Sequence, residues 1–365
     1  MKKLTTFQLM SIMLCARFFS TMTYFPFAYE NAAVYMLGAV ISTALQALIL
    51  LPAAVFAHAF NGEDPCGLSA SKSRVLGYAV SALYLVYFAF SAFITVGDFS
   101  YFMDYYFTGY IPRIMAVICS VLAAVYIARM KISVLGKAAV YASAGFIIMT
   151  VMVVCGSISD LYFTNFHFAE ENITDLIFSC VKAEFSRNGS LVLFVFLMSE
   201  LDASKGKKDM PISRAAWYFL AVKIIVLELI LFLITVILGD YVQLARLPFF
   251  SLAAYSQTGI IERFDGLFMF VWVIIAVVKL SAYIFCGAKC LRNLFPSLSR
   301  FTSAAAAGAV PAAASLFFLI PHNWERFAYS DGGAWQIVIL TAAVPVLLMI
   351  ICRKGGKEKN EKKLG

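Results

Sequence analysis

Eight ionisable residues interrupt the long apolar runs of this sequence, where a charge is costly to bury. On membrane-insertion scales an Asp, Lys or Arg at the centre of a spanning helix costs about 2.5–3.5 kcal/mol, so such residues are functional candidates by default. They can bind a charged ligand, carry protons or ions, or pair with one another. The residues are Arg17, Asp98, Glu200, Asp202, Lys223, Glu228, Asp265 and Lys279.

The other reactive residues form no catalytic or metal-binding pattern. The three histidines fall at the ends of apolar runs or between them, and Gly136-Lys137 lacks the earlier glycine of a phosphate loop. No metalloprotease helix or serine nucleophile elbow is present. The eight cysteines are scattered, and no further ligand joins Cys286 and Cys290. We therefore expect no enzyme activity, no catalytic residue, no cofactor, no metal site and no disulfide framework.

The elements that position the eight charges are expected to be membrane-spanning helices. Of the 365 residues, 62% are hydrophobic and 14% are charged, whereas soluble domains carry roughly 25% charged residues. A water-soluble fold of this length could not cover so much apolar surface, so lipid is the expected solvent. The net charge of +8 does not indicate nucleic-acid binding, because the basic residues lie in short clusters between apolar runs.

Ten segments are long and apolar enough to cross a bilayer, which takes about 20 residues. They are residues 5–27, 32–59, 75–105, 111–128, 136–157, 188–203, 212–238, 260–287, 301–320 and 333–352. Placing the N-terminus inside puts 20 Lys and Arg residues in the inner connections and the tail, and 6 on the outer side, as the positive-inside rule requires. We expect both termini in the cytoplasm, one transmembrane domain over 1–352 and a disordered basic tail over 353–365.

The first span combines a deep charge with a polar second half. Arg17 lies about 13 residues into the span, near the bilayer centre. Ser20, Thr21 and Tyr24 follow it. Pro26 then removes a helical hydrogen bond and strains the preceding turn. Either this helix is discontinuous and its freed backbone groups face a site, or it is kinked but continuous and Arg17 forms a structural ion pair.

The sixth span, residues 188–203, is short and ends in two acids, Glu200 and Asp202. The stretch Phe196–Asp202 is the second candidate for an interrupted helix, because it places both carboxylates within the span. The alternative is that the two carboxylates lie at the inner water interface.

Asp98 follows Gly97 inside the third span, where a buried carboxylate either pairs with a cation or becomes protonated. By depth, Arg17 is its nearest candidate partner. In the seventh span, Lys223 and Glu228 lie loosely on one side of the helix. Lys279, in the inner half of the eighth span, either extends to the inner interface or supplies a fixed positive charge inside the bundle.

Two outer connections are long and partly apolar. Residues 158–187 carry apolar residues at helical spacing, which predicts a short surface helix. Residues 239–259 contain Leu247-Pro248-Phe249-Phe250, and proline suits the first turn of a helix. This second connection either folds back as a lid or rests on the headgroups as a surface helix.

Ten spans divide into two halves of five, and the odd number gives the second half inverted topology. Spans one and six correspond under this division, and both are candidates for interruption. Paired interrupted helices in corresponding positions indicate a midplane site in a secondary transporter. The pattern resembles the LeuT-type fold of the amino-acid/polyamine/organocation superfamily, an all-α polytopic membrane protein with inverted repeats over roughly 5–157 and 188–352.

Within that superfamily the chain resembles the spore-germination receptor B subunits, the endospore germination permease family. The similar segments are Leu4-Thr5-Thr6-Phe7-Gln8, Tyr126-Ile127-Ala128-Arg129, Phe185-Ser186-Arg187 with Leu191-Val192-Leu193-Phe194, and Gly259 to Phe268 followed by Trp272, Lys279, Ser281 and Tyr283. Two features differ from the family pattern. A glycine common in the middle of span one is absent, and so is a proline in the second half of span six.

The resemblance implies a receptor subunit in the inner spore membrane that binds a small germinant, typically an amino acid, and signals through partner A and C subunits. The family fold implies a pocket between spans one, three, six and eight. By fold position the pocket residues are Arg17, Ser20, Thr21, Tyr24, Gly97, Asp98, Met198, Ser199, Phe268 and Trp272. Charges with a coupling or structural role are Glu200, Lys223, Glu228 and Lys279.

Two alternatives remain open. The chain could be a working amino-acid transporter, a permease of the same fold. In that case Lys279 favours a mechanism without sodium, because a built-in cation can replace the ion. The chain could also be a scaffold for partner subunits that binds no ligand, with Arg17 and Asp98 as an internal ion pair.

Overall fold

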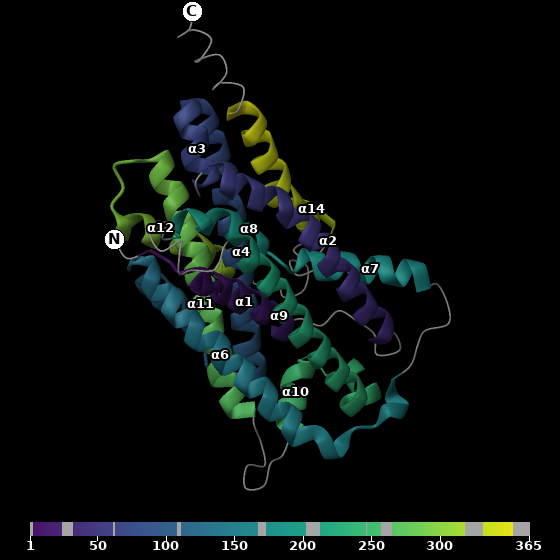
Figure 1. The fold of residues 1–365 in the computed structure, drawn as a ribbon. Coiled ribbons are helices and arrows are strands. Elements are labelled where there is room, and N and C mark those ends of the chain that lie inside the picture. The colour runs from purple at the N-terminus through teal and green to yellow at the C-terminus, as the bar shows by residue number, and fades with distance from the viewer. Residues whose placement is uncertain are drawn as a thin grey trace, which may run out of the picture.

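The computed structural model describes residues 3–23, 32–60, 63–107, 111–166, 173–201, 212–245, 247–256, 265–317 and 331–352. Within these ranges the chain is helical, and its β-type pairing is an isolated bridge between Leu4 and Leu201. Figure 1 shows α1 crossing the middle of a bundle formed by the longer helices.

Each of the ten predicted spans contains a helix. The first five are α1 (Thr6–Thr23), α2 (Ala32–Ala59), α4 (Arg74–Phe107), α5 (Arg113–Ala128) and α6 (Ile132–Ser157). The second five are α8 (Ser190–Leu197) with the 3-10 turn η4 (Met198–Glu200), α9 (Ile212–Leu233) with the π-helical turn η6 (Ile234–Leu238), α11 (Asp265–Leu294), α12 (Arg300–Phe317), and α14 (Asp331–Val338) with η8 (Ile339–Ala343). Six helices in the described ranges are long and apolar enough to cross a membrane, and α5 and α8 are shorter apolar helices.

The centre of the bundle is built around α11 and α1. Helix α11 packs against α4, α1, α5, α6 and α12. Nearly every residue of α1 is buried, so this helix has no lipid-facing stripe. The chain before α1 is fixed at the end of η4, because Leu4 N donates to Glu200 O at 2.9 Å. We call this end of the bundle, predicted to be cytoplasmic, the inner end.

The interruption of span six lies earlier than predicted. Helix α7 (Ile173–Ser186) precedes the span and lies across α2, as Figure 1 shows. Residues 187–189 are not helical, and α8 begins at Ser190. The predicted break at Phe196–Asp202 corresponds to a change from α-helix to the 3-10 turn η4, and Asp202 lies outside the described residues. The break predicted near Pro26 also lies outside them.

The two long outer connections each contain the predicted helix. The last two turns of α7 are buried and include Glu184, so this helix is more than a surface element. Helix α10 (Pro248–Tyr255) begins at Pro248, as expected. Its Phe249 and Phe250 are buried against Phe268 of α11, with ring centroids 4.9 and 5.9 Å away. The fold-back arrangement is therefore the one observed.

One short helix was not anticipated. Helix α3 (Pro65–Lys72) packs against α4 in the connection between spans two and three. Asp64 caps it, since its Oδ1 accepts from Gly67 N at 2.6 Å, and Pro65 occupies the first turn. This Asp-Pro pair is a common helix-start signal that hydropathy alone does not register.

Candidate functional site

The break at residues 187–189 opens onto a small polar cavity of about 50 Å³ between α1, α4, α11 and α14. Its lining residues include Ser20, Tyr87, Ser91, Arg187, Gly189 and Lys279. A cavity of this size has room for a few water molecules. Helix α8 starts at its wall with no side-chain cap on Gly189, so the positive end of a helix dipole lies beside the cavity.

Lys279 is fixed inside the bundle at this cavity and does not extend to the inner interface. Its side chain is 4% exposed. The Nζ atom donates to Ser20 Oγ at 2.8 Å and lies 4.6 Å from the centroid of the Phe19 ring. Asp98 on α4 is fully buried and interacts electrostatically with Lys279. Of the two roles considered for Lys279, the structure therefore favours the internal charge.

Arg17 forms its ion pair with Glu184 of α7. The Nη2 atom donates to Glu184 Oε2 at 2.5 Å, and Nη1 donates to Thr21 Oγ1 at 2.7 Å. Arg17 is 1% exposed and Glu184 is fully buried. The expected depths of the residues in the membrane had pointed to Asp98 as the partner of Arg17. The observed partner, Glu184, comes from an outer connection and is 167 residues away in the sequence.

Glu184 is the centre of a larger buried network, the Glu184 network, formed by Arg17, Glu184, Lys223, Gln46 and Asn188. Lys223 Nζ lies 3.3 Å from Glu184 Oε1 and donates to Gln46 Oε1 at 2.8 Å. Asn188 Nδ2 donates to the same Gln46 oxygen at 2.6 Å. The network therefore connects α1, α2, α7 and α9 to the break in span six. The carboxylate offsets one of the two positive charges beside it, and Gln46 connects Lys223 to Asn188 in the break.

An aromatic cluster lies on the outer side of Lys279. Trp272 is fully buried and stacks on Phe102 with centroids 3.9 Å apart; Phe99 and Phe19 lie at 5.4 and 5.1 Å. In the described part of the chain, Trp272 Nε1 has no hydrogen-bond acceptor. A buried indole N–H usually finds one, so this donor is an exception.

The structure brings together only part of the predicted pocket. Of the predicted pocket residues, Ser20 lines the cavity, where it accepts from Lys279. Thr21 accepts from Arg17, and Asp98, with Gly97 buried beside it on α4, interacts electrostatically with Lys279. The remaining positions on α11 are farther out: at 1.5 Å per residue, Trp272 lies about 10 Å and Phe268 about 16 Å from Lys279. Tyr24 lies outside the described residues.

Met198 and Ser199 lie at the inner end with Glu200, away from the cavity. Lys289 of α11 donates to Ser199 Oγ at 2.8 Å and to Glu200 Oε1 at 2.8 Å. It also pairs with Asp64 at 2.6 Å. Glu200 is 21% exposed, so the structure favours the water-interface position that was considered for it.

Two further predicted charges remain. Asp265, at the start of α11, is buried and accepts from Tyr106 Oη at 3.2 Å. Glu228 is half-buried on α9. Its Oε1 accepts no hydrogen bond within the described ranges. The charge of Lys223 on the same helix interacts with it electrostatically.

Several residues at the cavity and in the network were not singled out from the sequence. Gln46 is an amide inside a long apolar run, and that is a signal that a scan for charged residues overlooks. Glu184 belongs to the outer connection 158–187, outside every predicted span. Arg187-Asn188-Gly189, a polar and flexible triplet before an apolar run, marks the break itself.

Comparison with known proteins identifies a family and a fold. Residues 3–324 match the sequence model of a family described as spore germination protein. No curated protein matches the chain. Similar solved structures include a substrate-bound, outward-open Na⁺-coupled sialic acid symporter, with a TM-score of 0.60 and 13% identity, covering 93% of this chain and 79% of that one.

Two further structures have the same type of fold. Mhp1, a nucleobase-cation-symport-1 family transporter in a closed conformation with bromovinylhydantoin bound, gives a TM-score of 0.61 and 13% identity over 96% of this chain and 78% of that one. A manganese transporter from Eremococcus coleocola gives a TM-score of 0.53 and 13% identity, covering 95% of this chain and 77% of that one. The prediction of a polytopic LeuT-type membrane protein is confirmed.

Proposed function

The chain belongs to the spore germination protein family, and on that premise we propose that it is a germinant-sensing subunit of a spore germination receptor. In this role it binds a small molecule such as an amino acid at the midplane cavity. It lies in the inner spore membrane with both termini in the cytoplasm, and it passes the binding signal to A and C receptor subunits.

The observation that carries the proposal is the pair of cationic side chains, Lys279 and Arg187, that line one small polar cavity at the break in span six. The uncapped start of α8 adds the positive end of a helix dipole at the same place. In transporters of related architecture, the helix ends at such breaks bind anionic groups of the substrate. A carboxylate of an amino acid complements this set of donors.

The cavity is closed in this structure. Its volume of about 50 Å³ is well below the several hundred Å³ of most ligand pockets. Binding therefore requires the surrounding helices to separate. Its walls come from α1, α4, α11, α14 and the break in span six, so these are the elements whose positions change when a ligand enters. This coupling between occupancy and helix position is what a sensor needs.

A secondary amino-acid transporter is the second candidate function. The similar solved structures are transporters, two of them from cation-coupled symport families. Lys279 Nζ donates to Ser20 of α1, and an ammonium group at this place argues against a sodium ion between these two helices. A transporter of this kind would couple to protons or operate by exchange.

The test is a thermal-shift screen of L-amino acids on the purified full-length chain, with uptake into proteoliposomes measured on the same preparation. We expect a ligand-induced shift that is lost in Lys279→Met and kept in Lys137→Met, which removes an exposed lysine of α6. We expect no uptake. Robust uptake by the isolated chain would favour the transporter, and a shift that survives in Lys279→Met would remove the cavity from the proposal.

A further inference from the structure

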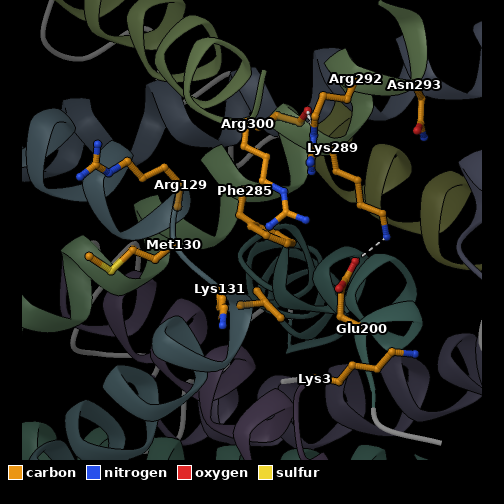
Figure 2. Close-up of a pocket in the computed structure, with 13 residues that line it drawn as sticks. Lys3, Arg129, Met130, Lys131, Glu200, Phe285, Lys289, Arg292, Asn293 and Arg300 are labelled. Atoms are coloured by element: carbon orange, nitrogen blue, oxygen red, sulfur yellow. Dashed lines mark hydrogen bonds and ion pairs between the residues drawn. The ribbon is translucent and has the colours of Figure 1, made fainter. Parts of the chain in front are cut away.

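A second, larger cavity lies at the inner end of the bundle, separate from the proposed ligand site. Its volume is about 460 Å³, within the range of small-molecule pockets. It is formed by the start of the chain, the α5–α6 turn, η4, the end of α11 and the start of α12, as Figure 2 shows. Lys289 at its wall is ten residues, about 15 Å, along α11 from Lys279.

The lining of this basic cavity is strongly positive. Its cations are Lys3, Arg129, Lys131, Lys289, Arg292 and Arg300, and its described lining contains one acid, Glu200. That acid is already paired with Lys289 at 2.8 Å. Arg292 and Arg300 lie close enough for their charges to repel each other. The positive charge around the cavity therefore exceeds the negative charge that its described lining supplies.

Backbone geometry adds to this positive potential. Helix α6 begins at Ile132, which lines the cavity, and its N-cap residue Lys131 provides no side-chain acceptor. The free N–H groups of a helix start and its dipole both favour an anion. A lysine at this position adds positive charge beside the positive end of the dipole, which is unfavourable unless an anion is also present.

Membrane topology explains why cations lie on this face, but it does not explain their arrangement. Three other cations are predicted to lie on the same inner face: Lys72, Lys137 and Arg214. Their side chains are exposed, and none of them lines the cavity. Apart from Arg129, the cavity cations come from separate segments and line one hollow. Figure 2 shows Arg300 and Lys289 reaching toward the space above Glu200, while Arg129 turns away from it.

We propose that the basic cavity binds a phosphate-bearing anion from the inner side of the membrane. Arg292 and Arg300 can each form paired hydrogen bonds to phosphate oxygens, and the lysines act as additional point charges. A multiply charged phosphate matches the excess of cations better than a single carboxylate does. Phe285, Met130 and Ala288 form an apolar wall that limits the site to one compact group.

The test measures binding of two probes to the full-length chain. Pyrophosphate binding to protein in neutral detergent, followed by calorimetry, reports a soluble phosphate. Co-purification and native mass spectrometry after exposure to phosphatidylglycerol or phosphatidylcholine vesicles report a lipid headgroup. We expect at least one phosphate probe to bind, and its affinity to fall about tenfold or more in Lys131→Gln/Arg292→Gln, because two charge-assisted contacts are removed.

The matched control is Lys137→Gln/Arg214→Gln, which removes one lysine and one arginine from the same predicted face outside the cavity. We expect it to retain the affinity of the parent chain. Equal weakening in both double variants would show general charge attraction and overturn the proposal. Absence of binding by both probes would also overturn it. Selective binding of pyrophosphate identifies a soluble ligand, and selective retention of phosphatidylglycerol identifies a lipid.

Discussion

The middle and the inner end of the bundle both hold buried or half-buried charges, and they balance them differently. In the middle, Glu184 lies between Arg17 and Lys223, and all three side chains are at most 1% exposed. At the inner end, Lys289 lies between Asp64 and Glu200, and these side chains are 8–21% exposed. In the middle one carboxylate pairs with two cations, and at the inner end one cation pairs with two carboxylates.

The difference lies in access to water. An unpaired charge in the middle has no solvent to replace its partner, so each member of the Glu184 network depends on the others. A charge at the inner end can regain hydration when its partner is removed. The middle network therefore determines how the helices are held together, whereas charges at the inner end can be exchanged for those of a bound ion.

Removal of the central carboxylate is expected to give the largest effect. Glu184→Gln leaves Arg17 and Lys223 facing each other without a counter-charge, and breaking a buried pair in this way costs about 3–5 kcal/mol. Glu200→Gln at the inner end is the matched change and is expected to cost about 1 kcal/mol or less. The melting temperatures of the purified proteins in one detergent check this. Equal shifts for the two variants would contradict the distinction between the regions.

An intermediate effect is expected from a methyl group at the break. A Cβ at Gly189 would lie 2.7 Å from Tyr87 Oη and 2.9 Å from Tyr283 Oη, so both rings must move. We expect Gly189→Ala to lower stability by about 1–2 kcal/mol through overpacking and to weaken amino-acid binding, because the cavity wall shifts.

The matched control for this change is Gly266→Ala, whose Cβ would meet nothing within 4 Å. An alanine there replaces a glycine in a helix and is expected to be neutral or slightly stabilising. Thermal shift with and without ligand measures both effects. Unchanged ligand binding in Gly189→Ala would place the ligand away from the break.

The sequence was sufficient to predict the ten spans but not the partners of their charges. Spans were found because a bilayer imposes a length and an apolar composition that are local properties of the chain. The start of α10 was also predicted from a local signal, the proline at position 248. The contact between Arg17 and Glu184 joins positions 167 residues apart, and nothing in either segment encodes that distance. Glu184 also lay outside every predicted span, so its burial could not be anticipated.

The position of Lys279 shows the same limit in another form. A lysine stem is long enough to reach an interface or to remain inside a bundle, and its helix position is the same in both cases. Only the contacts of Ser20 and Phe19 distinguish the two. By contrast, Gln46 and the Arg187-Asn188-Gly189 triplet were local signals, because polar residues next to apolar runs can be read from the sequence alone.

The smallest expected effect is the salt dependence of the two regions. At about 1 M salt the Debye length is about 3 Å, so partly exposed pairs are screened and buried pairs are screened much less. Lys289→Met is expected to lower stability by about 1 kcal/mol at low salt, and this cost is expected to shrink as NaCl is raised. The cost of Glu184→Gln is expected to stay nearly constant over the same range, because water and ions do not reach Arg17 or Lys223. If the stability lost in Glu184→Gln fell with rising salt as much as the stability lost in Lys289→Met, water would enter the middle of the bundle.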